Sequence, residues 1–279
     1  MNFYIIIPAH NEEAFIEKTL QSLVSQSLLP KRIIVVNDHS TDGTQQIIDH
    51  YSKSFPFISS ITISSEEQHL PGSKVIQAFQ KGLEKLDANF DILCKFDADL
   101  IFPNNYLEKI SEIFENNPKC GMAGGFCYIE RGGNWILENL TRKDHLRGAL
   151  KTYRKECFQD IGGVKASMGW DTVDELLAQY HGWDIITDES LEVKHLKPTG
   201  ATYTKASKYK QGEAFKKIRY GFWLTFIATT KLALRKRNFP FFLHTMFGYL
   251  KASNEFIVSK DEGKFIRNLR WKNIKKKLF

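Results

Sequence analysis

The amino-acid sequence predicts an α/β fold in which a mostly parallel, Rossmann-like sheet lies between two layers of helices. Two observations support this prediction. Over the first 120 residues, short apolar runs alternate four times with segments whose apolar residues recur at helical spacing, a pattern typical of parallel sheets that helices cover on both faces. The chain also has 279 residues, of which 42% are hydrophobic, so it is long enough to bury a sizeable core.

The expected strands and helices follow one another with short connections. The first helix is expected to begin at Asn11 and the second at Thr41 or Asp42, because such side chains cap helix N-termini. After Gly121 the pattern is less regular, and glycine pairs interrupt it. Strands are expected at 3–7, 33–36, 58–63, 91–96, 184–187 and 191–194, and further helices at about 75–86, 106–114 and 172–180.

The four cysteines form no C-x-x-C pair and do not lie near a histidine at zinc-ligand spacing. We therefore expect four buried thiols in a reducing compartment rather than disulfides or a zinc site. The N-terminus has neither a basic region nor a long apolar segment, so no secretory signal is expected.

The charge is distributed unevenly along the chain. Residues 205–279 carry 19 Lys and Arg against 4 Asp and Glu, whereas residues 1–204 carry 20 against 28. A basic end favours an anionic partner, either a membrane surface or a nucleic acid. Aromatic runs at 222–228 and 239–243 stand beside these cations and are too short to span a bilayer, which favours an interfacial segment on anionic lipid. The alternative is that the aromatic residues pack on the rest of the protein, and no reader motif supports nucleic-acid binding.

Polar residues follow three of the expected strands, in the segments 8–12, 37–44 and 97–99. In a parallel sheet these segments share one edge, where such folds bind ligands. Asp97 and Asp99 are spaced so that both carboxylates can hold a divalent cation, which neutralises a diphosphate. They are otherwise ordinary loop residues, and Asp38 either contacts a base or ribose or caps a loop. The sequence lacks G-x-G-x-x-G and G-x-x-x-x-G-K-[ST] motifs, which counts against dinucleotide enzymes and P-loop NTPases.

Five segments together resemble the family 2 glycosyltransferases of GT-A fold. YIIIPAHNEE, RIIVVNDHSTDGT and DILCKFDAD have the order and spacing of that family, and RGALKTYRKECFQDIGGV is similar to its acceptor-side segment. MGWDTVDELLAQYHGW, followed by VKHLKPTG, resembles its catalytic-base region and the histidine-containing strand after it. The resemblance implies a GT-A catalytic domain at 1–200, with a nucleotide-sugar half at about 1–100 and an acceptor half at about 101–200. Residues 201–279 would be a helical, membrane-associating extension.

The resemblance also implies roles for single residues. Asp171 would be the general base, although Trp170 stands before it where the family commonly has an acidic residue. Asp171 is otherwise a helix cap, with Asp174 and Glu175 as alternative bases. Trp170 either stacks on a sugar or fills the core. Nucleotide-sugar contacts would come from Pro8, Ala9, His10, Glu12, Asp38, Gly72, Lys74, Asp97 and Ala98, metal ligands from Asp97, Asp99 and His195, and acceptor contacts from Trp170, Arg147 and Arg154. The alternatives are that His195 is a partly exposed histidine without a ligand role, and that Arg147 and Arg154 hold a loop or are solvated charges.

The implied function is that of an inverting glycosyltransferase that depends on Mn²⁺ or Mg²⁺. It would move a sugar from a nucleoside diphosphate, by default UDP, to a glycan or lipid-linked acceptor in cell-surface polysaccharide synthesis. It would work as a peripheral protein at the cytoplasmic face of the cell membrane. The alternatives are a polyprenyl-phosphate glycosyltransferase, a non-catalytic membrane-surface binding module and a nucleotidyltransferase, although no glycine-rich, basic phosphate loop follows the first strand.

Overall fold

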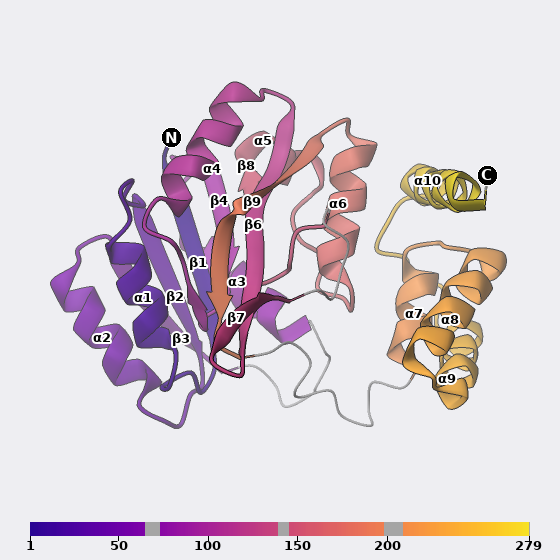
Figure 1. Ribbon diagram of the computed structural model, residues 1–279, viewed down its shortest axis with the longest axis horizontal. Helices are drawn as coiled ribbons and strands as arrows, with labels where there is room; N and C mark the ends of the chain where they lie inside the picture. The colour runs from indigo at the N-terminus through magenta and orange to yellow at the C-terminus, as the bar shows by residue number, and fades with distance from the viewer. Residues whose placement is uncertain (65–72, 139–144, 198–208, 279) are drawn as a thin grey trace.

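The structure is a computed structural model, and it describes residues 1–64, 73–138, 145–197 and 209–278. A central sheet lies between helices, and a group of helices from the C-terminal part of the chain stands beside it (Figure 1). The strands are β1 (Phe3–Ala9), β2 (Arg32–Asp38), β3 (Ile58–Ile63), β4 (Ile92–Phe96), β5 (Leu100–Ile101), β6 (Cys120–Arg131), β7 (Asn134–Leu137), β8 (Leu150–Arg154) and β9 (Asp184–His195). The helices are α1 (Ile16–Val24), α2 (Thr44–Ser54), α3 (Ser73–Leu83), α4 (Tyr106–Asn116), α5 (Lys155–Asp160), α6 (Trp170–Tyr180), α7 (Lys210–Lys217), α8 (Phe222–Lys236), α9 (Phe239–Lys251) and α10 (Lys260–Leu278).

The strands pair in the order β3-β2-β1-β4-β8-β6-β9-β5, and β7 pairs with β6. Strands β1 to β4 are mutually parallel where they pair, which confirms the expected Rossmann-like half. Strand β8 is antiparallel to β4, and its first residue, Leu150, lies opposite Phe96. The beginning of β8 therefore lies at the same edge as the carboxyl ends of β1, β2 and β4.

The apolar run of β1 serves two cores at once. Successive side chains of a strand point to opposite faces, so Ile5 and Ile7 pack in one core with α1, α2 and α4. Tyr4 and Ile6 pack in a second core with α3 and α6. A strand that is buried on both faces has apolar residues at nearly every position. For this reason the sequence of β1 is a continuous apolar run and does not alternate between apolar and polar residues.

The first helix does not begin at Asn11 as expected. Residues 12–15 form a turn, and α1 starts at Ile16 without a side-chain cap. Asn11 adopts a positive φ of 53°, which asparagine tolerates better than most residues. Its Oδ1 accepts a hydrogen bond from the Thr41 N–H at 2.8 Å. Asn11 thus ties the loops after β1 and β2 together instead of capping a helix.

The two short strands expected near the end of the sheet are one continuous strand, β9. It runs parallel to β6, and the register shifts between Gly124 and Phe126, so that the pairs formed by residues 184–187 of β9 and those formed by residues 192–194 are separated by an irregular stretch. A Cβ at Gly125 would collide with the Leu191 carbonyl, so this close approach requires glycine. The continuity carries His195 to the edge of the sheet, beside β5.

The helices α7, α8 and α10 share a core with α6, and α9 packs against α7. Phe215, Leu224 and Ile266 belong to the same core cluster as Val173 and Leu177 of α6. The expected boundary near residue 200 lies outside the described residues. Within the described part of the chain, no helix is both long and apolar enough to cross a membrane. The expectation of buried, unpaired thiols is confirmed for Cys94, Cys120, Cys127 and Cys157.

Candidate active site

The loops after β1 and β2 are joined side by side at the carboxyl edge of the sheet. His10 Nδ1 donates to the Asp38 carbonyl at 2.6 Å, and the Glu12 N–H donates to Thr44 Oγ1 at 2.8 Å. Pro8 and Ala9 are the last two residues of β1 and are buried. The five residues predicted for the nucleoside pocket from these two loops, Pro8, Ala9, His10, Glu12 and Asp38, thus lie together.

A threonine of α1 fixes the loop that follows β4. The buried Thr19 hydroxyl donates to the Ala98 carbonyl at 2.8 Å and accepts from the Leu100 N–H at 3.0 Å. The Asp97 N–H donates to the Ala149 carbonyl at 2.8 Å. These contacts hold both ends of the Asp97-Ala98-Asp99 segment. Thr19 was not among the predicted residues, because its role depends on a contact with a loop almost 80 positions away.

His195 stands against Asp99 because β5 and β9 pair. The Leu196 N–H donates to the Asp99 carbonyl at 2.9 Å, and His195 Nε2 lies 3.4 Å from Asp99 Oδ2. The other ring nitrogen, Nδ1, lies 3.1 Å from Glu138 Oε2. Burial by itself disfavours the charged ring, but the hydrogen bonds to Asp99 and Glu138 prevail and raise the pKa of His195 to about 9.

The donor set suits a hard or borderline divalent cation. Asp97, Asp99 and His195 offer carboxylate oxygens and one imidazole nitrogen, which are ligands of Mn²⁺ and Mg²⁺ sites. The second nitrogen of His195 is held by Glu138, as is usual for a metal-ligating histidine. Cys127 also lies close to Glu138 and His195, but a cysteine thiolate is a soft ligand, which the hard cations Mn²⁺ and Mg²⁺ bind less readily than carboxylate oxygens. The residues predicted as metal ligands are therefore chemically suited to bind Mn²⁺ or Mg²⁺.

Glu12 and Lys197 close the site from the side of β1. Lys197 Nζ lies 2.7 Å from Glu12 Oε1. The pKa of Glu12 is raised, chiefly by burial and also by the charges of Asp99 and Asp97, against the opposing effect of Lys197. Carboxylates that perturb one another in this way lie close together. The acidic residues that follow β1 and β4 therefore converge at one edge.

A buried lysine lies beneath the carboxylates. Lys95 is 1% exposed, forms a short ion pair with Asp97 and donates to the Gly148 carbonyl at 3.0 Å. Its ammonium also lies 5.3 Å from the centre of the Trp170 ring. Lys95 was not among the predicted residues, although a single charged residue inside an otherwise apolar strand is a visible signal. Lys95 thus connects the Asp97-Ala98-Asp99 loop to Gly148 and Trp170.

Asp171 reaches the same edge from the first turn of α6. A Cβ at Gly148 would lie 3.2 Å from Asp171 Cβ, so this glycine permits the approach. The Asp171 side chain is 31% exposed and makes no capping hydrogen bond, since Gly169 precedes the helix with a φ of 74°. Its position is therefore not explained by helix capping. Burial favours the neutral acid, but His145 and Lys151 prevail and lower the pKa of Asp171, so it is ionised at neutral pH.

The two alternative bases are held in the protein interior. Asp174 accepts hydrogen bonds from Lys151 at 2.9 Å and from the Tyr153 hydroxyl at 2.6 Å, and it is 2% exposed. Glu175 accepts from the Leu146 N–H and from Lys151. Both carboxylates are committed to buried partners, which favours Asp171 over either of them as the candidate base.

The three residues predicted to contact the acceptor lie in different surroundings. Trp170 is 6% exposed and packs in the core under Lys95, which favours the core-filling alternative over sugar stacking. Arg147 lies at the site, where it contacts Glu138 at 3.1 Å. Arg154 lies opposite Ile92, at the far end of β4, and donates to the Cys120 and Phe114 carbonyls. The assignment of Arg154 to the acceptor is therefore corrected.

Lys74 and Gly72 belong to the segment between β3 and α3. Lys74 lies in the first turn of α3 and is partly buried. Gly72 lies outside the described residues. Because β3 is parallel to β2, the beginning of α3 stands at the same edge of the sheet as the loops after β1 and β2. Lys74 therefore stays a candidate for contact with the nucleotide.

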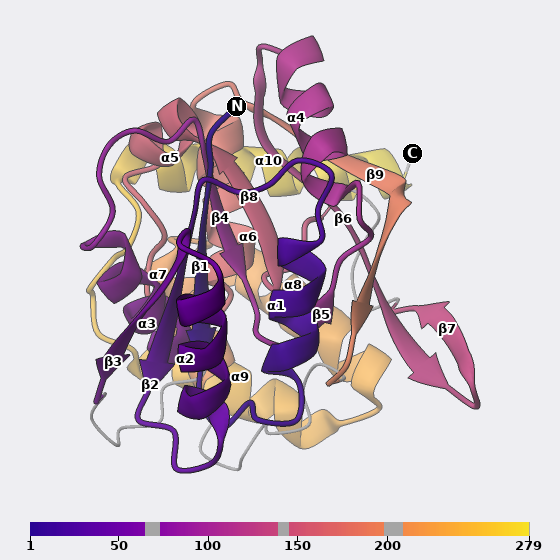
Figure 2. The same ribbon diagram turned by 90° about the vertical axis from the view of Figure 1, so that its left-hand side faces the viewer.

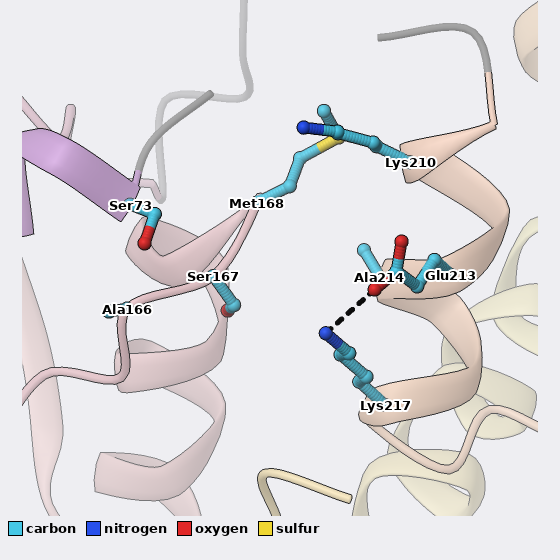
Figure 3. A pocket seen from close by; sticks show the side chains of 8 residues that line it. All are labelled: Ser73, Ala166, Ser167, Met168, Lys210, Glu213, Ala214 and Lys217. Carbon is cyan, nitrogen blue, oxygen red and sulfur yellow. Dashed lines mark ion pairs between the residues drawn. The ribbon is translucent and has the colours of Figure 1, made fainter. Parts of the chain in front are cut away.

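A pocket lies between the loop that leads into α6 and one side of α7, along the whole length of that helix (Figure 3). The Ser167 and Lys217 side chains point into it from opposite walls, and Lys217 forms an ion pair with Glu213 at 2.7 Å. The pocket is lined by Ser73, Ala166, Ser167, Met168, Lys210, Glu213, Ala214 and Lys217. It separates the segment before α6 from α7.

A pH titration tests the contact of His145 with Asp171. His145 Nδ1 lies 2.8 Å from Glu175 Oε2 and Nε2 lies 3.6 Å from Asp171 Oδ2. Burial opposes the charge, but these two carboxylates raise the pKa of His145 to about 9. A raised pKa stabilises the fold fully below the unfolded value, near 6.5, and this contribution is lost as pH rises through about 9. Over that window His145 should contribute on the order of 3 kcal/mol to the free energy of unfolding.

Urea denaturation of wild type and His145→Gln between pH 6 and 10 measures this contribution. The difference between the two proteins isolates His145 from every other group, including His195. The stability of the variant should fall less steeply above pH 7. Equal slopes for the two proteins would show that the His145 charge is not coupled to folding.

Sequence and structure comparisons identify similar proteins. Residues 4–164 match the model of the family described as "Glycosyl transferase family 2". The chain is 35% identical over 204 residues to "Probable glycosyltransferase YdaM" of Bacillus subtilis, a match that covers 63% of this chain and 44% of that protein. It is 24% identical over 185 residues to a poly-beta-1,6-N-acetyl-D-glucosamine synthase of Staphylococcus epidermidis, covering 60% and 41% respectively. The chain thus matches less than half the length of these two relatives.

Two solved structures have the same fold. One is S. aureus TarS 1-349 in complex with UDP-GlcNAc, with a TM-score of 0.59, 17% identity, and coverage of 84% of this chain and 67% of that one. The other is the mannosyltransferase PcManGT from Pyrobaculum calidifontis in complex with GDP-Man and Mn²⁺, with a TM-score of 0.57 and 15% identity. That match covers 90% of this chain and 70% of the mannosyltransferase. At these identities the likeness concerns the fold, which confirms the expected GT-A architecture.

Proposed function

Because the chain belongs to glycosyl transferase family 2, we propose that it is an inverting glycosyltransferase that uses a nucleoside-diphosphate sugar. One observation carries this proposal. The Asp97-Ala98-Asp99 loop and Asp171 meet at one edge of the sheet, with Lys95 and Gly148 between them. A donor-side pair of carboxylates therefore faces an acceptor-side carboxylate, as a single displacement reaction requires.

The loops after β1 and β2 are the proposed nucleoside pocket. Asp38 ends the buried strand β2, so its carboxylate is placed to accept hydrogen bonds from a base or a ribose. UDP is the default nucleotide because of the family, and the complex of TarS with UDP-GlcNAc agrees with this choice. The complex of PcManGT with GDP-Man shows that the same fold also accepts a guanine nucleotide.

Asp97, Asp99 and His195 are the residues that would hold Mn²⁺ or Mg²⁺. When bound, such a cation neutralises the diphosphate and stabilises it as a leaving group. Thr19 fixes the loop that carries both carboxylates, and Glu138 fixes the orientation of the His195 ring. The protein therefore supplies a positioned set of ligands whose geometry does not depend on the substrate.

Asp171 is the proposed general base. Its lowered pKa keeps it ionised at neutral pH, so it can accept the proton of the attacking acceptor hydroxyl. The hydroxyl would attack the anomeric carbon from the face opposite the diphosphate, which inverts the configuration at that carbon. His145 contacts the Asp171 carboxylate and would stabilise its charge before the acceptor binds.

The proposed acceptor is a glycan or a lipid-linked glycan at an anionic membrane surface on the cytoplasmic side. The Staphylococcus relative named as a poly-beta-1,6-N-acetyl-D-glucosamine synthase supports a role in polysaccharide synthesis. A polyprenyl-phosphate acceptor is the second candidate. It is favoured by the basic C-terminal helices beside the site, since phosphate is an anion that lysine and arginine bind. An assay with each acceptor separates the two.

A thermal-shift panel of nucleotide sugars, with and without Mn²⁺, tests the donor. A ligand at 100 times its Kd stabilises a protein by about 2.7 kcal/mol, which raises the melting temperature of a protein of this size by about 5 °C or more. The true donor should give such a shift only when Mn²⁺ or Mg²⁺ is present. A panel in which no nucleotide sugar shifts the melting temperature would contradict the proposal. Donor hydrolysis separates an enzyme from a non-catalytic binding module, which would show none.

A further inference from the structure

The helices α8 and α9 each present an apolar stripe to solvent. On α8 the exposed residues Trp223, Phe226, Ile227 and Leu234 recur at helical spacing, and on α9 Phe239, Leu243, Phe247 and Leu250 do the same. Trp223 is 69% exposed, Leu234 73% and Leu250 62%. Residues three, four, seven or eight positions apart lie on one side of a helix. We call these eight residues the outer face.

The opposite sides of the same helices are already occupied. Leu224, Thr225 and Thr229 of α8 are buried, and Gly248 of α9 lies so close to Tyr209 that a Cβ would collide with its carbonyl. The helices therefore pack on the protein with one side and expose the outer face with the other. The inner side of α8 packs in the core that α6 shares, and the inner side of α9 packs against α7, so packing on the protein leaves the outer face available.

Ring contacts join the two stripes into one surface. Phe222 contacts Trp223 at a centroid distance of 5.3 Å and Phe226 at 6.4 Å. Phe242 continues the series, at 5.5 Å from Phe226 and 6.1 Å from Phe239. A continuous exposed surface of aromatic and aliphatic side chains is unusual on a soluble protein and indicates an interaction site.

The charge around the outer face has one sign. Between Glu213 and Glu255 the chain has eight Lys and Arg and no Asp or Glu. The Lys236 ammonium lies 4.3 Å from the centre of the Phe241 ring, and that of Lys251 lies 4.5 Å from the centre of the Phe247 ring. Such stems cover apolar surface while their charged ends reach outwards. The combination fits the boundary between anionic head groups and acyl chains.

We infer that the outer face of α8 and α9 docks the protein on the surface of an anionic lipid bilayer. The two helices lie along the interface, with Trp223 and the leucines in the acyl boundary and the cations at the head-group phosphates. Figures 1 and 2 place α9 at the same end of the molecule as the carboxyl ends of β1 to β3. Docking thus brings the candidate active site close to the membrane. This consequence, but not the docking itself, rests on the proposed function and points to an acceptor carried by a lipid.

Vesicle sedimentation tests the docking. The wild-type protein should bind vesicles of phosphatidylglycerol and phosphatidylcholine, bind pure phosphatidylcholine at least tenfold more weakly, and be released by 0.5 M NaCl, because salt screens surface charge. Leu234→Ser with Leu243→Ser should lower the partition coefficient at least tenfold. Each of Arg235→Gln and Lys236→Gln should lower it about fivefold on anionic vesicles. All of these positions are exposed, so the variants should fold.

The matched control is Leu29→Ser with Ile136→Ser, two exposed apolar residues, 52% and 39% exposed, outside the C-terminal helices. This control should bind vesicles as wild type does. The inference fails if wild type does not bind anionic vesicles or if the control loses binding equally. It also fails if light scattering shows a dimer that Leu234→Ser with Leu243→Ser dissociates, since a second copy would then cover the outer face. Nucleotide binding is measured without vesicles, and vesicle binding is measured without nucleotide. The result for the proposed function is therefore independent of the result for membrane docking.

Discussion

Asp99→Asn should reduce turnover about 10³-fold or more while leaving the protein folded. The carboxylate of Asp99 is buried and faces His195 Nε2, so it is placed to hold, together with His195, a cation that neutralises the diphosphate. An amide is a much weaker ligand for a hard cation, and loss of the cation removes several kcal/mol of charge stabilisation from the transition state. The measurement is kcat with saturating donor and Mn²⁺.

A readout independent of turnover accompanies this assay. The melting-temperature shift produced by nucleotide sugar together with Mn²⁺ should disappear in Asp99→Asn. The matched control is Asp91→Asn, which makes the same change at the other end of β4 and should keep both the shift and kcat. Full activity of Asp99→Asn, with an unchanged Mn²⁺ dependence, would remove Asp99 from the site and with it the proposed cation site.

The same substitution at Asp97 should have an additional consequence. Lys95 is buried and forms an ion pair with Asp97, so Asp97→Asn leaves an ammonium without its carboxylate partner. We expect a loss of about 1–3 kcal/mol in stability together with the loss of turnover, somewhat less than for a fully buried pair because Asp97 is partly exposed. Asp99→Asn is therefore the cleaner test of the cation site.

The parallel half of the fold could be predicted from local pattern. Its strands are buried on both faces and thus appear as short apolar runs, and each helix between them has one apolar side. The clustering of polar residues after β1, β2 and β4 follows from topology alone, because parallel strands end at one edge. For this reason Glu12, Asp38 and Asp97 were placed correctly at the same edge without knowledge of any contact.

The contacts of the antiparallel half could not be predicted in this way. His195 meets Asp99 only because β5 pairs with β9, and nothing in the residues around Leu100 indicates that partner. Arg154 was misplaced for the same reason, since the direction of β8 decides which of its ends reaches the site. Glu138 and His145 are single polar residues whose partners lie on other elements, so no spacing pattern could have identified them.

Asp171→Asn should lower kcat by about 10²- to 10⁴-fold, the usual contribution of a general base. The substitution keeps the size of the side chain and removes only its ability to accept a proton. Donor binding, measured as the melting-temperature shift with nucleotide sugar and Mn²⁺, should not change, because Asp171 lies on the acceptor side of Gly148. The expected signature is therefore a fall in kcat without loss of donor affinity.

The pH profile and a matched control complete this test. Because the pKa of Asp171 is lowered, its carboxylate should stay ionised between pH 7 and pH 5. Protonation of Asp171 should therefore not reduce the kcat of the wild type over this range. Asp184→Asn, at an exposed carboxylate at the start of β9, should keep the wild-type kcat. Asp174→Asn should instead destabilise the fold, since Asp174 pairs with the buried Lys151. If Asp171→Asn retained wild-type kcat, the base would have to be another group, and the inverting mechanism proposed for this edge of the sheet would lose its acceptor-side carboxylate.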